Sequence, residues 1–169
     1  GFKNGTDGNL QIAFDAIKSA SGSHHFLSVT TKGNSAIFST SGNPYCHTIL
    51  RGGSNKINYD AKSIDDVSAR LDKAGLPQQI IVDCSHANSL KDHKKQMVVV
   101  DDLANQLSNG EKRIKGLMIE SNLVEGNQNI NDDKLIYGKS VTDACIGWED
   151  TKKALYKLSE AIENRKSNA

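Results

Sequence analysis

The sequence predicts a parallel α/β fold. Short apolar runs alternate with longer amphipathic stretches along the 169 residues, and we count four strand-then-helix units with one hairpin inserted among them. The predicted strands are nearly continuous apolar runs, which is typical of parallel strands covered on both faces. Because such units pair in parallel through right-handed crossovers, we expect one parallel sheet flanked by helices.

The chain begins in the middle of an apparent strand. Residues 1–3 form the end of this strand, and the turn-rich residues 4–8 separate it from the first helix. Residues 10–20 place four apolar side chains on one helical face, as an amphipathic helix does. Residues 25–29 form the next strand. A chain that starts with Gly1 in a strand leads us to expect processing or truncation.

A polar interlude with two β-prone pieces follows. Residues 35–39 and 46–50 are separated by a linker that contains Gly42 and Pro44, so we expect them to pair as an inserted β-hairpin. A glycine- and asparagine-rich loop then runs to Tyr59. We therefore assign residues 35–58 to an insertion made of this hairpin and a loop.

The regular alternation then resumes. Gly75 and Pro77 end the next helix, because glycine and proline commonly follow a helix terminus. Residues 121–140 form a polar loop of about twenty residues. A loop of that length without regular structure usually has a function. The expected elements are a helix over 64–74, a strand over 79–84, a helix over 91–108, a strand over 114–120, this loop, and a helix from about 150.

Composition excludes several classes of protein. The 21 basic and 20 acidic side chains give a formal net charge of +1, so we expect no nucleic-acid partner and no anionic membrane partner. Three cysteines without C-x-x-C spacing disfavour a disulfide-stapled fold and indicate a reducing compartment, so we expect the cytoplasm. No apolar run is long enough to cross a bilayer. The length suits one domain.

Polar residues follow the predicted strands. Lys3, His86 and Glu120 stand at strand ends, and Asp143 comes after the last long loop. Parallel α/β folds place their sites at the carboxyl ends of strands, so these side chains should converge. One imidazole and two carboxylates suit a divalent transition metal such as Mn, Fe, Co or Zn. The alternative is a hydrogen-bonded polar cluster without a metal.

Lys3 and Arg51 form a second candidate pair. Each has glycine within two residues, which allows the backbone to approach an anion closely. Arginine offers a planar bidentate fork for phosphate, and lysine a point charge. The alternative is that both are solvated surface cations. His93, in a lysine-rich turn, is expected to be exposed, and all three cysteines to be small buried hydrophobes.

Six motifs then occur in one order. Together they resemble the type I, feedback-regulated 3-deoxy-D-arabino-heptulosonate 7-phosphate synthases, which open the shikimate pathway of aromatic amino acid biosynthesis. The resemblance covers essentially the whole chain. The motifs are residues 1–8 (GFKNGTDG), 49–53 (ILRGG), 83–89 (DCSHANS), 118–121 (MIES), 123–128 (LVEGNQ) and 137–150 (YGKSVTDACIGWED).

The resemblance implies a (β/α)₈ TIM barrel of which this chain is the C-terminal half. Residues 1–169 would then hold strands 5–8 with their helices, with the hairpin inserted after the sixth strand, residues 25–29. The N-terminal half is absent from this chain. A full barrel takes about 250 residues, which agrees with four units and an insertion in 169 residues.

The resemblance also implies the chemistry. The family condenses phosphoenolpyruvate with erythrose 4-phosphate and releases phosphate, with one divalent metal ion as cofactor. By motif match His86, Glu120 and Asp143 are metal ligands, and Lys3 and Arg51 bind phosphoenolpyruvate. We count Lys3, Arg51 and His86 as catalytic. The metal would polarise the sugar aldehyde as a Lewis acid.

Departures from the family pattern predict that this half is inactive alone. The family's ligand cysteine is matched by none of Cys46, Cys84 and Cys145. The predicted partners are the N-terminal half, further copies in a dimer or tetramer, and an aromatic amino acid inhibitor near Phe26 and Ser28. Two alternatives stay open, an enzyme like 3-deoxy-octulosonate 8-phosphate synthase and a non-catalytic half-barrel binding module.

Overall fold

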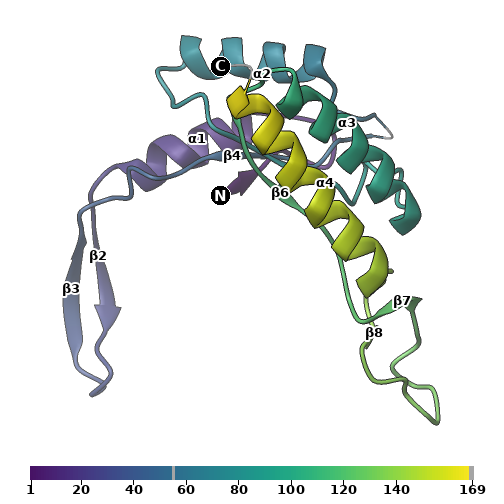
Figure 1. Cartoon of the computed structure of the whole chain (residues 1–169). Coiled ribbons are helices and arrows are strands. Elements are labelled where there is room, and N and C mark those ends of the chain that lie inside the picture. The colour runs from purple at the N-terminus through teal and green to yellow at the C-terminus, as the bar shows by residue number, and fades with distance from the viewer. Residues whose placement is uncertain (55, 168–169) are drawn as a thin grey trace.

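A four-stranded parallel sheet forms the centre of the computed structural model, which describes residues 1–54 and 56–167. Its strand order is β1-β4-β5-β6, and helices α1 to α4 lie along one side of it (Figure 1). The predicted α/β fold with a parallel sheet is confirmed. The bounds are β1 Phe2–Lys3, β4 Thr48–Leu50, β5 Ile80–Asp83, β6 Ile114–Met118, α1 Gln11–Ser21, α2 Ala61–Lys73, α3 Gln96–Ser108 and α4 Trp148–Ser167.

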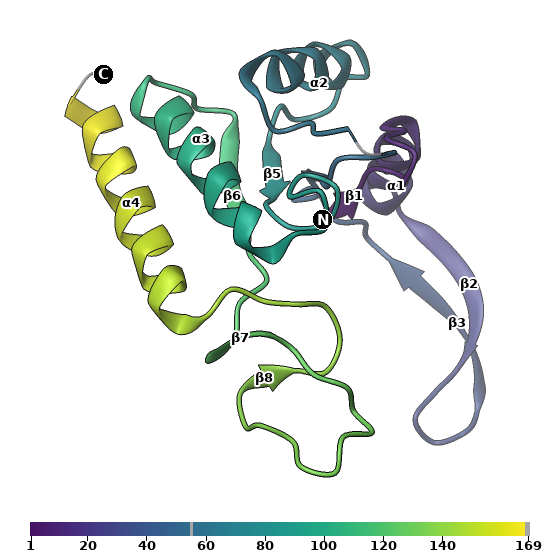
Figure 2. The same cartoon turned by 90° about the vertical axis from the view of Figure 1, so that its right-hand side faces the viewer.

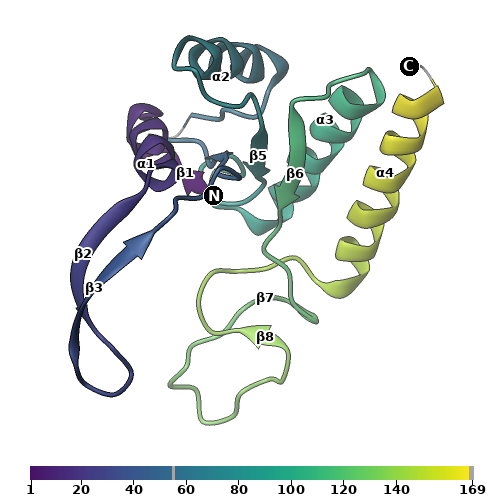
Figure 3. The same cartoon turned by 90° about the vertical axis from the view of Figure 1, so that its left-hand side faces the viewer.

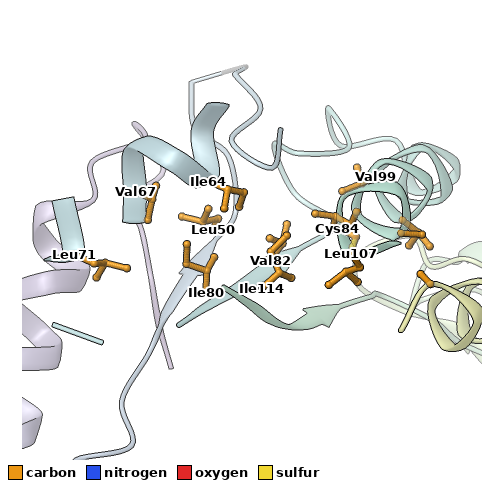
Figure 4. Close-up of a cluster of buried hydrophobic side chains, with 14 of the residues drawn as sticks. Leu50, Ile64, Val67, Leu71, Ile80, Val82, Cys84, Val99, Leu107 and Ile114 are labelled. Carbon is orange, nitrogen blue, oxygen red and sulfur yellow. The ribbon is translucent and has the colours of Figure 1, made fainter. Parts of the chain in front are cut away.

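The hydrophobic core lies between the sheet and the helices. Leu50, Ile80 and Val82 point from the strands toward Ile64 and Val99 of the helices, and all five side chains are at most 1% exposed (Figure 4). Burial of each such side chain contributes roughly 1.5–3 kcal/mol. This packing fixes the sheet on the helices and thereby sets where the strands end.

The other face of the sheet is less covered. Side chains alternate between the faces of a strand, so Ile81 and Met118 point away from the core. Ile81 is half-buried and Met118 is 39% exposed. The expectation that both faces are covered is therefore wrong for this chain as far as it is described. Lys3, Asp83 and Glu120 belong to this open face by the same alternation.

The hairpin prediction is wrong in its partners. β2 (His24–Val29) pairs antiparallel with β3 (Ser35–Thr40), and Gly33, at φ 82°, closes the turn between them. The hairpin therefore spans residues 24–40, and it precedes β4 instead of following the second strand of the sheet. Residues 25–29 are mostly exposed and belong to the hairpin, whereas the buried run in β4 enters the sheet between β1 and β5.

The hairpin and the polar loop both extend from the body of the molecule. Figures 1 and 3 show the β2–β3 ribbon leaving on one side and the loop with β7 (Val124–Asn127) and β8 (Lys139–Ser140) on the other. The prediction that the loop lacks regular structure is wrong, because β7 and β8 pair in parallel. The extended shape leaves apolar side chains of both segments exposed, such as Leu27 and Tyr137.

The helix boundaries follow local signals. Asp60 caps α2, since its side chain accepts a hydrogen bond of 3.1 Å from the Ser63 amide, and Gly75 follows the helix at φ 68°. α3 begins at Gln96, later than expected, because Leu90 and Lys91 have positive φ and a 3₁₀ turn follows at His93–Lys95. Figure 2 shows α3 and α4 side by side. Among the described residues, no helix combines the length and apolar character of a membrane span.

Candidate active site

The structure brings His86, Glu120 and Asp143 together from three different loops. One ligand atom of each lies within 4.8 Å of the others, and His86 Nε2 is 3.7 Å from Glu120 Oε1. The three line a cavity of about 190 Å³ with Ser85, Lys91, His93 and Ala144. A metal-free polar cluster would be held together by hydrogen bonds among its members. Within the described residues these three side chains make no hydrogen bonds to one another. One imidazole nitrogen and two carboxylates fit a divalent transition metal.

Glu120 is held at its backbone and its side chain. The Gln96 amide, fully buried at the start of α3, donates to Glu120 O at 3.0 Å and accepts from Glu120 N at 2.8 Å. The Ser85 hydroxyl donates to Glu120 Oε2 at 2.8 Å. Glu120 Oε1, the other oxygen, faces His86. The carboxylate is thus oriented before any ligand arrives, as a binding site requires.

Asp83 is a functional candidate that sequence reasoning missed. Its side chain is 2% exposed, and its Oδ2 lies 2.6 Å from Lys3 Nζ and 2.9 Å from His86 Nδ1. His86 itself has a φ of 51°, in the left-handed region that most residues avoid. A buried carboxylate beside the second nitrogen of a ligating histidine is a recurrent support for metal sites. Asp83 therefore joins the predicted phosphate-binding lysine to the predicted metal ligand.

Replacement of Asp83 by Asn is expected to weaken metal binding. Asp83→Asn removes the negative charge between Lys3 and His86 but keeps the shape, so the imidazole loses the carboxylate that lies 2.9 Å from its Nδ1. We expect a loss of roughly 10–100-fold in Mn²⁺ affinity, measured by titration calorimetry in the complete protein. Asp133→Asn, at an exposed position of the β7–β8 loop, is the control. Equal affinities of Asp83→Asn and the control would refute the assigned role.

Arg51 is half-buried in the loop after β4. Its Nε atom is buried and makes no hydrogen bond to any described residue, and its backbone N–H donates to Asn4 Oδ1 at 2.9 Å. A buried guanidinium nitrogen without a partner costs free energy unless a ligand satisfies it. The alternative of a solvated surface cation therefore fits Arg51 poorly. Lys3 is also half-buried, through its contact with Asp83.

The expectation that His93 is exposed is wrong. Its side chain is 20% exposed, it lines the cavity, and its Nε2 lies 3.0 Å from Glu125 Oε1. The hydrogen bond from His93 and the nearby Lys94 ammonium lower the pKa of Glu125. His93 is partly covered because the β7 strand, which was expected to be loop, places Glu125 beside the 3₁₀ turn. His93 therefore connects the wall of the cavity to the Glu125 carboxylate outside it.

The cysteines lie outside the three-residue cluster in the described chain. Cys46 and Cys84 are buried, and burial strongly raises the pKa of the Cys84 thiol, as expected for a small hydrophobe. Cys145 is half-buried, two residues after Asp143, and burial is also the main cause that raises its pKa. A thiol with a raised pKa is a poor nucleophile and a poor ligand at neutral pH.

Phe26 and Ser28 lie on the hairpin, away from the cavity. Phe26 is 48% exposed and stacks on Phe38 of the facing strand, with ring centroids 6.0 Å apart. Ser28 is half-buried on the same strand. The open interpretation of Phe26 as ordinary core is wrong, because its side chain is not part of the buried cluster. The stacked pair forms an exposed aromatic surface on the hairpin.

Known proteins match this chain over nearly its whole length. The family described as DAHP synthetase I matches residues 1–156. The Phe-sensitive phospho-2-dehydro-3-deoxyheptonate aldolase of Escherichia coli K12 is 56% identical over 167 residues, covering 98% of this chain and 47% of that protein. The phenylalanine-inhibited aldolase of Saccharomyces cerevisiae is 49% identical over 174 residues, covering 98% and 47%.

A solved structure matches equally well. The phospho-2-dehydro-3-deoxyheptonate aldolase of Francisella tularensis SCHU S4 superimposes with a TM-score of 0.91 at 50% identity, covering 96% of this chain and 48% of that one. The chain thus spans about half the length of the relatives it matches. The fold of this chain is therefore similar to that of a segment of a larger protein.

Proposed function

Because this chain belongs to the DAHP synthetase I family, we propose that it supplies half of a 3-deoxy-D-arabino-heptulosonate 7-phosphate synthase. The complete enzyme condenses phosphoenolpyruvate with erythrose 4-phosphate and releases phosphate. One observation carries the proposal: His86, Glu120 and Asp143 converge on one cavity, and Asp83 connects His86 to Lys3. The proposed cellular location is the cytoplasm.

The proposed architecture is the C-terminal half of a (β/α)₈ barrel. β1 and β6 are the edge strands of the described sheet, and its helices lie on one side (Figure 1). Beside β6 and α4 lies an apolar cavity of about 280 Å³, lined in part by Leu117, Leu155 and Ile162. Barrel closure removes such edges and covers such surfaces. A complementary half that adds four strands would pair with both edges at once.

His86, Glu120 and Asp143 would hold the divalent ion, with His86 Nε2 as the ligating nitrogen because Nδ1 faces Asp83. The bound ion would supply Lewis-acid polarisation of the sugar aldehyde. Gln96 and Ser85 keep Glu120 in place. The donor set of one imidazole nitrogen and two carboxylates fits Mn, Fe, Co or Zn.

Lys3 and Arg51 would bind and orient phosphoenolpyruvate. The Arg51 fork offers two parallel donors to phosphate oxygens, and Lys3 adds a positive charge above Asp83. Carbon 3 of the bound substrate attacks the aldehyde carbon, water adds at carbon 2, and phosphate then leaves. Positioning of the two substrates and stabilisation of the leaving phosphate are what these cations contribute.

Regulation by an aromatic amino acid is proposed for the hairpin. The relatives named above carry the words Phe-sensitive and phenylalanine-inhibited in their names. The exposed Phe26–Phe38 stack and the nearby Ser28 offer an aromatic surface and a hydroxyl to such a ligand. Further copies of the enzyme in a dimer or tetramer are the proposed partners of the extended hairpin.

Reconstitution tests the proposal. The 169-residue chain, its mass checked by mass spectrometry, is assayed with Mn²⁺, phosphoenolpyruvate and erythrose 4-phosphate, first alone and then with a purified N-terminal half from a relative. We expect turnover only in the mixture. Full turnover by the chain alone would refute the half-barrel proposal. A mixture that forms a complex without turnover would identify a binding module, and a preference for arabinose 5-phosphate would identify the octulosonate-type enzyme.

A further inference from the structure

Three asparagines connect the loops that carry the proposed catalytic residues. Asn4 follows β1 and Lys3, Asn58 lies in the loop after Arg51, and Asn88 follows His86. Asn4 and Asn88 are each 3% exposed, and Asn58 is half-buried. Buried amides are costly unless their hydrogen bonds are satisfied, so the partners of these side chains reveal what they hold.

Asn4 binds the loop of Arg51. Its Oδ1 accepts from the Arg51 backbone N–H at 2.9 Å, and its Nδ2 donates to Gly52 O at 2.9 Å. Asn4 Nδ2 also donates to Gly5 O at 2.8 Å. Gly52 has a φ of 70° and leaves no room for a Cβ, because such an atom would lie 2.8 Å from the Asn88 amide nitrogen and from Lys56 O. The Arg51 loop is therefore fixed at two consecutive residues by one side chain.

Asn58 and Asn88 extend the network to the His86 loop. Asn58 Oδ1 accepts from the Gly52 N–H at 2.8 Å, and Asn58 Nδ2 donates to Asn4 Oδ1 at 3.2 Å. Asn88 Oδ1 accepts from the Asn58 N–H at 2.9 Å. Asn88 Nδ2 donates to Leu50 O at 3.1 Å and to Asp83 O at 2.8 Å. One chain of hydrogen bonds thus joins the ends of β1, β4 and β5.

We propose that Asn4, Asn58 and Asn88 are positioning residues that set the separation between the phosphate-binding cations and the metal ligand His86. This inference rests on the proposed function of Lys3, Arg51 and His86. The network bonds the backbone on either side of Arg51 and at Asp83, before His86, and it touches neither the Arg51 nor the His86 side chain. A fully satisfied buried network has one low-energy arrangement, so it preorganises the cavity before substrate arrives.

Asn58→Ala is the primary test, because Asn58 is the least buried of the three and its side chain contacts the Arg51 loop. The substitution removes the acceptor of the Gly52 amide and a donor to Asn4, while Asn88 still holds Leu50 and Asp83. In the reconstituted enzyme we expect the KM for phosphoenolpyruvate to rise roughly tenfold. Mn²⁺ affinity should stay within about twofold of the wild type, since His86 keeps its support.

Amide hydrogen exchange gives a readout that does not depend on turnover. We expect the Gly52 amide to lose protection in Asn58→Ala and to keep it in Asn58→Asp, where a carboxylate oxygen still accepts from Gly52. Asn58→Asp keeps the acceptor for Gly52 but loses the donor to Asn4 Oδ1, so it tests the Gly52 bond if Asn58→Ala does not fold, and its KM should lie between those of the wild type and Asn58→Ala. Asn105→Ala, at an exposed position of α3, is the control and should match the wild type.

The results separate the two proposals. Wild-type KM together with wild-type Gly52 protection in Asn58→Ala would overturn the positioning role while the enzyme remains active. A loss of Mn²⁺ affinity as large as the rise in the KM for phosphoenolpyruvate would also overturn it, because the network would then act on the whole fold. Absence of turnover in the wild-type mixture would overturn the proposed function, and the exchange data would still report on the network.

Discussion

His86→Asn in the reconstituted enzyme is expected to abolish metal-dependent activity. The substitution removes the one imidazole among the three side chains that meet within 4.8 Å. Asn is chosen because His86 has a φ of 51°, and Asn tolerates the left-handed region better than Ala does. The backbone of the loop should therefore survive the change. The loss in Mn²⁺ affinity should exceed the roughly 10–100-fold that follows removal of an outer partner of a ligand.

Metal content and activity are measured together. The purified variant is dialysed against Mn²⁺ and its bound metal is determined by atomic spectroscopy, alongside turnover at saturating substrate. His24→Ala, at an exposed position of the hairpin, is the matched control and should keep both. Retained activity with unchanged metal content in His86→Asn would remove His86 from the ligand set. Lost activity with unchanged metal content would mean that His86 acts in the reaction without binding the metal.

The convergence of these side chains was predictable because a topological rule acts on each strand separately. Lys3, His86 and Glu120 each follow an apolar run, and parallel strands bring their carboxyl ends to one edge. That rule needs no knowledge of long-range contacts. Asp143 stands outside it, because it comes 23 positions after Glu120 and the β7–β8 pairing decides where it lies. It was included because it comes after the last long loop and before the final helix, and the motif resemblance then matched it to a ligand.

The hairpin shows where local patterns fail. Residues 25–29 and 46–50 are both short β-prone runs, and the sequence of either fits a buried strand. The choice depends on which run pairs with β1, a contact between residues more than forty positions apart. The local signal that favours the observed hairpin is Gly33, a glycine between two short β-prone runs. In the structure its N–H donates to Thr30 O at 2.9 Å and closes the turn.

Asp83 and the asparagines could not be assigned a role from the sequence. Asp83 continues an apolar strand, and its function appears only when Lys3 and His86 reach the same oxygen. Asn4, Asn58 and Asn88 lie in loops, where asparagine is common for local turn reasons. Their buried hydrogen bonds link positions 47 and 54 residues apart, which no spacing rule anticipates.

Arg51→Lys is expected to raise the KM for phosphoenolpyruvate roughly 10–100-fold. Lysine keeps the charge but lacks the planar fork, so at least one charge-assisted hydrogen bond to phosphate is lost, and each such bond contributes about 1.5–3 kcal/mol. The buried Nε of Arg51, which has no partner in the described chain, disappears as well. We therefore expect weaker substrate binding without a large loss of folding stability.

Steady-state kinetics with inorganic phosphate as competitor distinguishes binding from other effects. If Arg51 holds the phosphate group, the inhibition constant of phosphate should rise in parallel with KM, whereas Mn²⁺ affinity should not change because Arg51 is not among the metal-ligand cluster. Lys56→Ala removes an exposed cation from the same loop and is the control for net charge. Similar shifts in both variants would mean that the loop acts through its overall charge. An unchanged KM in Arg51→Lys would place the phosphate elsewhere, and Lys3 would then be the next cation to test.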